Sequence, residues 1–130
     1  AVEGALKSKE ISYIHSEAFA SGELKHGTIA LITDGVPVVV NATQSDLFEK
    51  SVSNIKEVTS RGAYVIAVAK EGNTVVEEVA DEVFYIPNVE DDYAGFPTIV
   101  IHQLLAYYLS KLKGNDVDKP RNLAKSVTVE

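Results

Sequence analysis

The chain has 130 residues, of which 45% are hydrophobic and 24% charged, so it can form one globular core and has little room for a second domain. Its formal net charge of −7 argues against general nucleic-acid binding, because proteins that bind the phosphate backbone are usually basic. The sequence has no cysteine, which excludes disulfides and a cysteine nucleophile within it, and no apolar run long enough for a membrane span, so we expect a cytoplasmic protein.

The first third of the chain has helical and polar segments. Apolar residues at helical spacing predict a helix over residues 2–15, followed by a second short helical turn that ends near Gly22. Residues 23–27 are polar and predict a loop or helix terminus, and residues 28–33 fit either a strand or a helical turn. Because the sequence opens directly on a helix, we expect part of a longer protein whose first strand is missing here.

Three continuous apolar runs in the middle of the chain are typical of strands buried on both faces. Helices are predicted between them, and a long amphipathic helix follows over residues 96–112, with Pro97 in its first turn. The strands are predicted at residues 37–41, 63–69 and 82–87. The first helix between them should start at a cap formed by Ser45 or Asp46 and end at Gly62, and the second should start at Asn73 or Thr74.

Alternating strands and helices predict an α/β domain with a doubly wound, flavodoxin-like parallel sheet flanked by helices. We expect a single, partial domain over residues 1–130, in which residues 115–130 form a polar C-terminal tail. Three strands are few for such a sheet, which agrees with a missing first strand. Ligands of these sheets bind beyond the carboxyl ends of the strands, so we expect the chemistry there.

Two groups near the start of the chain could carry chemistry. Lys7 and Glu10 share a helix face, so they form either a solvated ion pair or a carboxylate base beside a cation that tunes it. His26 precedes Gly27, which allows unusual backbone angles. His26 is either structural or exposed, or it is a proton shuttle, since histidine exchanges protons near neutral pH.

The tail is the third candidate. Residues 118–126 are either a solvated charged end or a segment that docks on the domain, stiffened by Pro120 and carrying Leu123 as a residue to bury. In the second case Lys125 would lie against the domain, where a deprotonated amine can form a Schiff base with a sugar carbonyl.

Other patterns for common sites are missing from the sequence. His15 and His102 fall in helical patterns and are interpreted as structural or surface residues. No set of histidines and carboxylates has metal-ligand spacing, and no glycine-rich phosphate loop is present.

Three segments together resemble the second sugar-isomerase (SIS) domain of the glutamine–fructose-6-phosphate aminotransferases, also called glucosamine-6-phosphate synthases. They are residues 3–15, 22–27 and 116–130, which read EGALKSKEISYIH, GELKHG and DVDKPRNLAKSVTVE. The resemblance runs through all 130 residues in order and is weakest over residues 43–97.

The resemblance implies an isomerizing aminotransferase that makes glucosamine 6-phosphate from fructose 6-phosphate and ammonia released from glutamine. Its isomerase half opens the sugar ring, forms an imine and moves a proton between C1 and C2 without a metal or organic cofactor. The implied partners are a glutaminase domain, a first SIS domain that holds the sugar phosphate, and a second subunit of a homodimer. Without them we expect this chain to be inactive.

The resemblance also implies roles for individual residues. Glu10 would be the acid/base that carries the C1–C2 proton, with Lys7 as a helper in proton transfer. Lys125 would form the Schiff base and Ala124 would contact the sugar through its backbone. His26 would assist ring opening in the site of the neighbouring subunit. Because an ordinary lysine is protonated at neutral pH, we expect Lys125 to be partly buried or near other cations.

One alternative is a non-catalytic SIS module that binds a phosphosugar and regulates a partner. Such a module needs neither a base at Glu10 nor a nucleophile at Lys125. A flavodoxin-like domain of unrelated use is a further alternative, but it leaves the specific tail unexplained.

Overall fold

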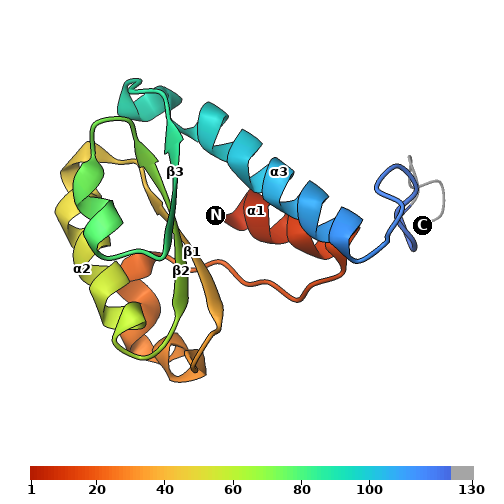
Figure 1. Cartoon of the computed structure of the whole chain (residues 1–130), viewed down its shortest axis with the longest axis horizontal. Helices are drawn as coiled ribbons and strands as arrows, with labels where there is room; N and C mark the ends of the chain where they lie inside the picture. The colour runs from red at the N-terminus through yellow and green to blue at the C-terminus, as the bar shows by residue number, and fades with distance from the viewer. Residues whose placement is uncertain (124–130) are drawn as a thin grey trace.

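The computed structural model describes residues 1–123, and it has a central sheet with helices on both faces (Figure 1). The sheet consists of β1 (Pro37–Ala42), β2 (Tyr64–Lys70) and β3 (Glu82–Ile86), which lie side by side in chain order. Both strand pairs are parallel. The predicted α/β fold with a parallel sheet between helices is therefore confirmed.

The central strand explains why these runs form strands. Val65, Ala67, Val68 and Ala69 of β2 have no exposed surface, because each face of the sheet is covered. Side chains of successive residues point to opposite faces, so a strand buried on both sides must be apolar throughout. Hydrophobic burial on both faces thus selects the continuous apolar runs that the sequence shows.

On one face of the sheet, α2 (Phe48–Thr59) supplies the main core. Its buried side chains recur at helical spacing, and the short helix Thr74–Glu78 adds Val76 to them. The predicted side-chain cap at Ser45 or Asp46 is wrong, because Leu47 is the N-cap residue and makes no side-chain bond. The buried members of this core are Ala42, Val52, Ile55, Val58, Ala63, Val65, Ala67, Ala69 and Val76.

On the other face lie α3 (Gly95–Leu112) and, beside it, α1 (Val2–Lys7) (Figure 1). The two helices approach closely at Gly4, where a Cβ atom would lie 2.4 Å from Nδ1 of His102. No side chain fits there, so glycine permits the contact. The same histidine ring lies 2.9 Å from Oδ1 of Asn41 through its Nε2 atom, which ties α3 to β1.

The N-terminal helix ends earlier than predicted. Instead of continuing through residues 2–15 as one α-helix, the chain winds more widely over Ser8–Ser12 as a π-helical turn, η1. Tyr13 then takes left-handed angles, with φ of 57°. The hydroxyl of Ser110 in α3 donates to the carbonyl of Ile11 at 2.7 Å, so this terminal carbonyl is satisfied by α3 rather than by another helical turn.

The segment before β1 also differs from expectation. Residues 13–20 have no regular structure, so the short helical turn predicted there is wrong. Two 3₁₀ helices follow instead, η2 (Ser21–His26) and η3 (Thr28–Leu31), which resolves the ambiguity over residues 28–33 in favour of a helical turn. Gly27 joins them with φ of 148°, an angle that side-chain-bearing residues rarely adopt.

Candidate functional site

Lys7 and Glu10 meet where α1 passes into η1. The Lys7 ammonium donates a hydrogen bond of 2.7 Å to Oε2 of Glu10 and lies 3.4 Å from Oε1 of Glu3. The Lys7 and Glu10 side chains are half-buried, with 31% and 28% of their surface exposed. The structure therefore brings together the two residues that the sequence paired, at a point that is neither fully solvated nor sealed.

The electrostatics of this pair define its chemistry. The hydrogen bond to Glu10 raises the pKa of Lys7 above its ordinary value; burial opposes this shift, and the charges of Glu10 and Glu3 reinforce it. Lys7 is therefore a cation at neutral pH, and the Glu10 carboxylate accepts its hydrogen bond. A carboxylate fixed by a neighbouring cation can take a proton from, and return it to, a substrate atom within about 3 Å.

Side chains from the end of α3 hold the segment that carries Glu10. Ser110, which is fully buried, bonds the carbonyl of Ile11, and the Lys113 ammonium donates to the carbonyl of Ser12 at 2.7 Å. These bonds join residues about a hundred positions apart in the chain. They fix a π-helical turn, a geometry that recurs at functional sites. The backbone that carries Glu10 is therefore held rigidly.

The described part of the tail reaches the same place. The backbone N–H of Arg121 donates to the hydroxyl of Tyr13 at 2.8 Å, and the Arg121 guanidinium lies 4.1 Å from the centre of the Tyr13 ring. Tyr13 directly follows η1. The predicted roles of Ala124 and Lys125 fall outside the described residues.

The 3₁₀ helix η2, which carries His26, lies on the α2 side of the sheet, whereas α1, which leads into the turn with Glu10, lies on the α3 side (Figure 1). The helix η2 is attached to α2, where Leu24 packs against the core and the Lys25 ammonium lies 3.1 Å from Oε2 of Glu57. His26 itself is exposed. Within one chain the structure therefore does not bring His26 together with Lys7 and Glu10.

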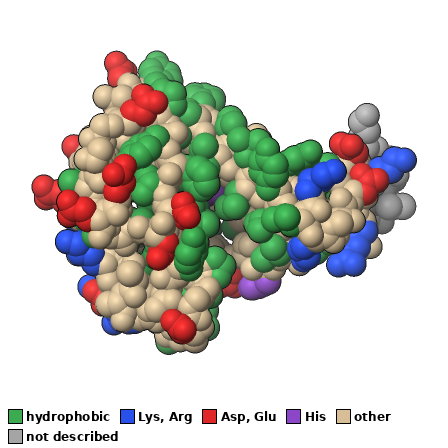
Figure 2. Space-filling model, in the orientation of Figure 1, with side chains coloured by type: hydrophobic (Ala, Val, Ile, Leu, Met, Phe, Trp, Pro, Cys, Tyr) green, Lys and Arg blue, Asp and Glu red, His purple; other side chains and the backbone are tan. Residues whose placement is uncertain are grey.

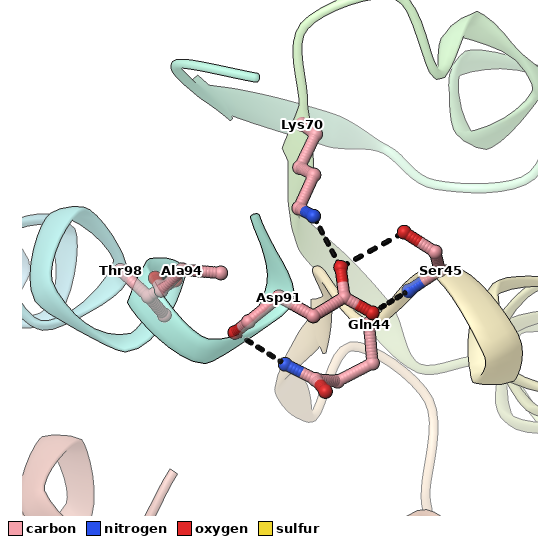
Figure 3. Close-up of polar contacts among 6 residues, drawn as sticks. All are labelled: Gln44, Ser45, Lys70, Asp91, Ala94 and Thr98. Atoms are coloured by element: carbon pink, nitrogen blue, oxygen red, sulfur yellow. Dashed lines mark hydrogen bonds and ion pairs between the residues drawn. The ribbon is translucent and has the colours of Figure 1, made fainter. Parts of the chain in front are cut away.

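A polar cluster that sequence reasoning missed joins three strand ends (Figure 3). Lys70, at the end of β2, is 5% exposed, and its ammonium donates to Oδ1 of Asp91. The backbone N–H and the hydroxyl of Ser45 each donate to the same carboxylate at 2.8 Å. The Lys70 bond, followed by the two Ser45 bonds, lowers the pKa of Asp91 to about 2.

A signal for this cluster was present in the sequence. Lys70 ends an apolar run, and Asp91 and Ser45 lie in the loops that follow the neighbouring strands. Carboxyl ends of parallel strands meet at one edge of the sheet, so their polar residues converge. The Gln44 side chain also bonds the backbone carbonyl of Asp91, at 3.3 Å. The cluster therefore fixes the loop after β1 and the loop before α3.

Two small cavities flank α3. One of about 180 Å³, with both polar and apolar lining, lies at the carboxyl end of β1, where Asn41, Gln44 and His102 line it, but neither Lys7 nor Glu10 does. An apolar one of about 150 Å³ lies between α3 and the sheet and contains no carboxylate or lysine. Figure 2 shows further hydrophobic side chains on the outer surface of α3. Neither cavity contains the candidate pair.

The two remaining histidines are structural or surface residues, as predicted, although His15 is not in a helix. Burial lowers the pKa of His102, whose ring is enclosed between α1, α3 and β1. The side chain of His15 is 84% exposed, and Nε2 lies 3.5 Å from Oε1 of Glu17. Neither residue contacts the Lys7–Glu10 pair.

Two kinds of feature are absent from residues 1–123. No three histidine or carboxylate side chains in this part of the chain gather closely enough to hold a metal ion. None of the helices described here is both long and apolar enough to cross a membrane.

Comparisons with known proteins point to one family. The family model for the SIS domain matches residues 1–112. The glutamine–fructose-6-phosphate aminotransferase (isomerizing) of Clostridium acetobutylicum is 64% identical over all 130 residues, and that of Caldanaerobacter subterraneus is 62% identical. The chain spans about a fifth of the length of these curated relatives, 21% in each case.

Solved structures agree with the sequence comparisons. The C-terminal domain of glucosamine–fructose-6-phosphate aminotransferase from Francisella tularensis superimposes with a TM-score of 0.82 at 41% identity, covering 91% of this chain and 33% of that one. A glucosamine-6-phosphate deaminase from Thermotoga maritima has a TM-score of 0.76 at 32% identity, covering 97% of this chain and 35% of that one.

Proposed function

This chain belongs to the SIS domain family, and we propose that it is the carboxyl-terminal isomerase portion of a glutamine–fructose-6-phosphate aminotransferase. The observation that carries the proposal is the Lys7–Glu10 pair, at 2.7 Å, on a turn held rigidly against α3. The pair lies in a chain whose 130 residues are 64% identical to the matching part of one such aminotransferase. In this proposal the enzyme makes glucosamine 6-phosphate.

The proposed reaction has three steps. Ring opening moves the proton of the C2 hydroxyl to the ring oxygen and leaves a ketone at C2. The amine of Lys125 adds to C2, water leaves, and ammonia then displaces the lysine to give an imine of the sugar. Removal of a proton from C1, with protonation of the imine nitrogen, forms a C1=C2 double bond with a hydroxyl on C1 and an amine on C2. Return of a proton to C2, with loss of the proton of the C1 hydroxyl, leaves an aldehyde at C1 and an amine at C2. No external oxidant or reductant is needed, because C1 is oxidised as C2 is reduced.

The roles of the side chains follow from where they lie. Glu10 exchanges the proton between C1 and C2, and its rigid helix keeps the carboxylate in position. Lys7 remains protonated because its pKa is raised, so it acts as a fixed cation beside Glu10 and not as a base. Lys125 forms the imine, and the backbone of Ala124 contacts the sugar.

The proposal requires partners beyond this chain. A glutaminase domain would supply ammonia, and a first SIS domain would hold the sugar phosphate. The helix with His26 lies across the sheet from the turn with Glu10, which supports a homodimer in which the His26 of one subunit assists ring opening at the site of the other. The proposed enzyme works in the cytoplasm, and the isolated chain is inactive.

Replacing Lys125 with arginine in the full-length enzyme tests the proposal. The guanidinium keeps the charge but cannot form an imine, so we expect synthesis of glucosamine 6-phosphate to fall at least 100-fold while fructose 6-phosphate still binds. Lys119→Arg is the matched control, because Lys119 is an exposed lysine of the same tail and has no assigned role. It should leave synthesis unchanged.

Two results would count against the proposal. Unchanged synthesis in Lys125→Arg would remove Lys125 from the mechanism. If the unmodified full-length protein binds fructose 6-phosphate but makes no product from it and ammonia, the chain belongs instead to a phosphosugar-binding regulatory module.

A further inference from the structure

At the end of the turn that carries Glu10, Tyr13 holds the tail through a contact with Arg121, which lies 108 positions later in the chain. The two components of this contact act on different parts of Tyr13. The phenol oxygen accepts the backbone N–H of Arg121 at 2.8 Å, while the ring face receives the guanidinium at 4.1 Å. Arginine is always charged and stacks well on aromatic rings, so this contact does not depend on pH near neutrality.

The chain around Arg121 is shaped for this attachment. Oδ1 of Asp116 accepts the backbone N–H groups of Asp118 and Lys119 at 3.0 and 3.3 Å, which forms a compact turn before the contact. Asn122 directly after it has φ of 61°, in the left-handed region that asparagine tolerates better than most residues. The backbone therefore has a defined conformation both before and after Arg121, although Arg121 itself is exposed.

The position of the contact along the chain gives it a consequence for chemistry. Glu10 lies three residues before Tyr13, and Lys125 lies four residues after Arg121. Four residues span at most about 14 Å, whereas a tail held only at Asn115 would give Lys125 about 35 Å of freedom. The local concentration of a tethered group falls roughly as the −3/2 power of the tether length, so a tether of four residues in place of ten corresponds to a rise of about four-fold.

We propose that Tyr13 and Arg121 form a tether that positions Lys125 for imine formation, so that Tyr13 is a positioning residue of the reaction although it does not touch the substrate. This inference rests on the proposed function of the chain and adds a role that the Lys7–Glu10 pair does not supply. Tyr13 suits this role because η1 fixes it at the end of the turn that carries Glu10.

The test measures imine formation directly in the full-length enzyme. Fructose 6-phosphate is added, borohydride reduces the imine at successive times, and mass spectrometry reports the fraction of Lys125 that carries the sugar. We expect Tyr13→Ala to slow this trapping about four-fold. Tyr13→Phe retains the ring but not the acceptor oxygen, so its rate should be intermediate. The KM for fructose 6-phosphate should change less than the trapping rate.

Matched variants separate positioning from general stability. Tyr85→Phe also deletes a tyrosine hydroxyl with one exposed hydrogen bond, to Glu77 at 2.6 Å, but Tyr85 packs with the α2-side core and should trap at the normal rate. Arg121→Gln removes only the exposed guanidinium, so it keeps the test valid if Tyr13→Ala does not fold. We expect it to slow trapping about two-fold.

The outcomes distinguish the tether from the proposed function. If the unmodified enzyme gives no sugar adduct on Lys125, the proposed function fails and the tether fails with it. If that enzyme is trapped normally but Tyr13→Ala and Arg121→Gln trap at the same rate, only the tether is wrong. A loss in Tyr13→Ala that Tyr85→Phe reproduces would also overturn it, because the effect would then be one of stability.

Discussion

The two faces of the sheet are held by different kinds of interaction. On the α2 side, residues such as Val52, Ile55 and Val58 form a continuous core with the strands. Among the described residues, the buried cluster on the α3 side is smaller and consists of Val68, Ile86 and Ala94, with Val39, Val89 and Ile101 packed against it. The contacts there that hold η1 are hydrogen bonds, such as those from Ser110 and Lys113 to backbone carbonyls, while α1 packs against α3 at Gly4.

This difference separates stability from function. Apolar packing is non-directional and depends on buried area, so the α2 side can stabilise the domain without fixing any one atom. Hydrogen bonds require particular distances and angles, so the α3 side can hold Glu10 in one place. The comparison predicts that damage to the α2 side lowers stability, whereas damage to the α3 side also displaces the candidate site.

The largest effect on stability should come from the α2 side. Ile55 has no exposed surface, so Ile55→Ala should lower the free energy of unfolding by about 4 kcal/mol through lost burial and the cavity left behind. Chemical denaturation measures this change. In the full-length enzyme, synthesis by the protein that remains folded should stay normal, and a loss of activity in folded protein would show that the two faces are not separable in this way.

A smaller effect, joined to a loss of activity, is expected from Gly4→Ala between α1 and α3. The new Cβ atom would lie 2.4 Å from the buried His102 ring, so the helices must move apart at a cost of about 2 kcal/mol. Because α1 leads into the turn with Glu10, synthesis per folded molecule should also fall. Gly95→Ala is the control: nothing lies within 4 Å of its Cβ position, and it should alter neither property. Normal activity in Gly4→Ala would show that damage to the α3 side does not displace the candidate site.

The smallest effect should come from Asp91 and should depend on pH. The pKa of Asp91 is lowered from 3.8 to about 2, so the folded state favours its ionised form. Its contribution to stability is therefore complete above about pH 4 and is lost as the pH falls toward 2. The difference in unfolding free energy between the unmodified chain and Asp91→Asn should shrink over this range.

Added salt should distinguish the ion pair of Asp91 from that of a second carboxylate, Glu57. Lys25 lowers the pKa of Glu57 through an exposed ion pair, whereas the Lys70 partner of Asp91 is buried. Salt screens exposed pairs more strongly. Added salt should therefore weaken the effect of Glu57→Gln more than that of Asp91→Asn, and equal salt sensitivity would contradict the assigned burial of the Lys70–Asp91 pair.

The sequence was most informative where structure depends on neighbours in the chain. Three apolar runs predicted β1, β2 and β3, because burial on both faces leaves a local pattern. The spacing of Lys7 and Glu10 predicted their contact for the same reason, since residues three apart in a helix are adjacent. The predicted cap at Ser45 failed because that residue bonds Asp91, 46 positions away, and no local pattern records such a partner.

What the sequence determined by itself, then, was the set of strands and helices and the pairing of a cation with a carboxylate near the start of the chain. Tertiary structure decided the rest: the early end of α1 at η1, the contact between Tyr13 and Arg121, and the position of the helix with His26 across the sheet from the turn with Glu10. The physical reason is that local periodicity follows from steric and hydrophobic preferences of adjacent residues. A hydrogen bond across a hundred residues exists only after the sheet and its helices have brought its two ends together.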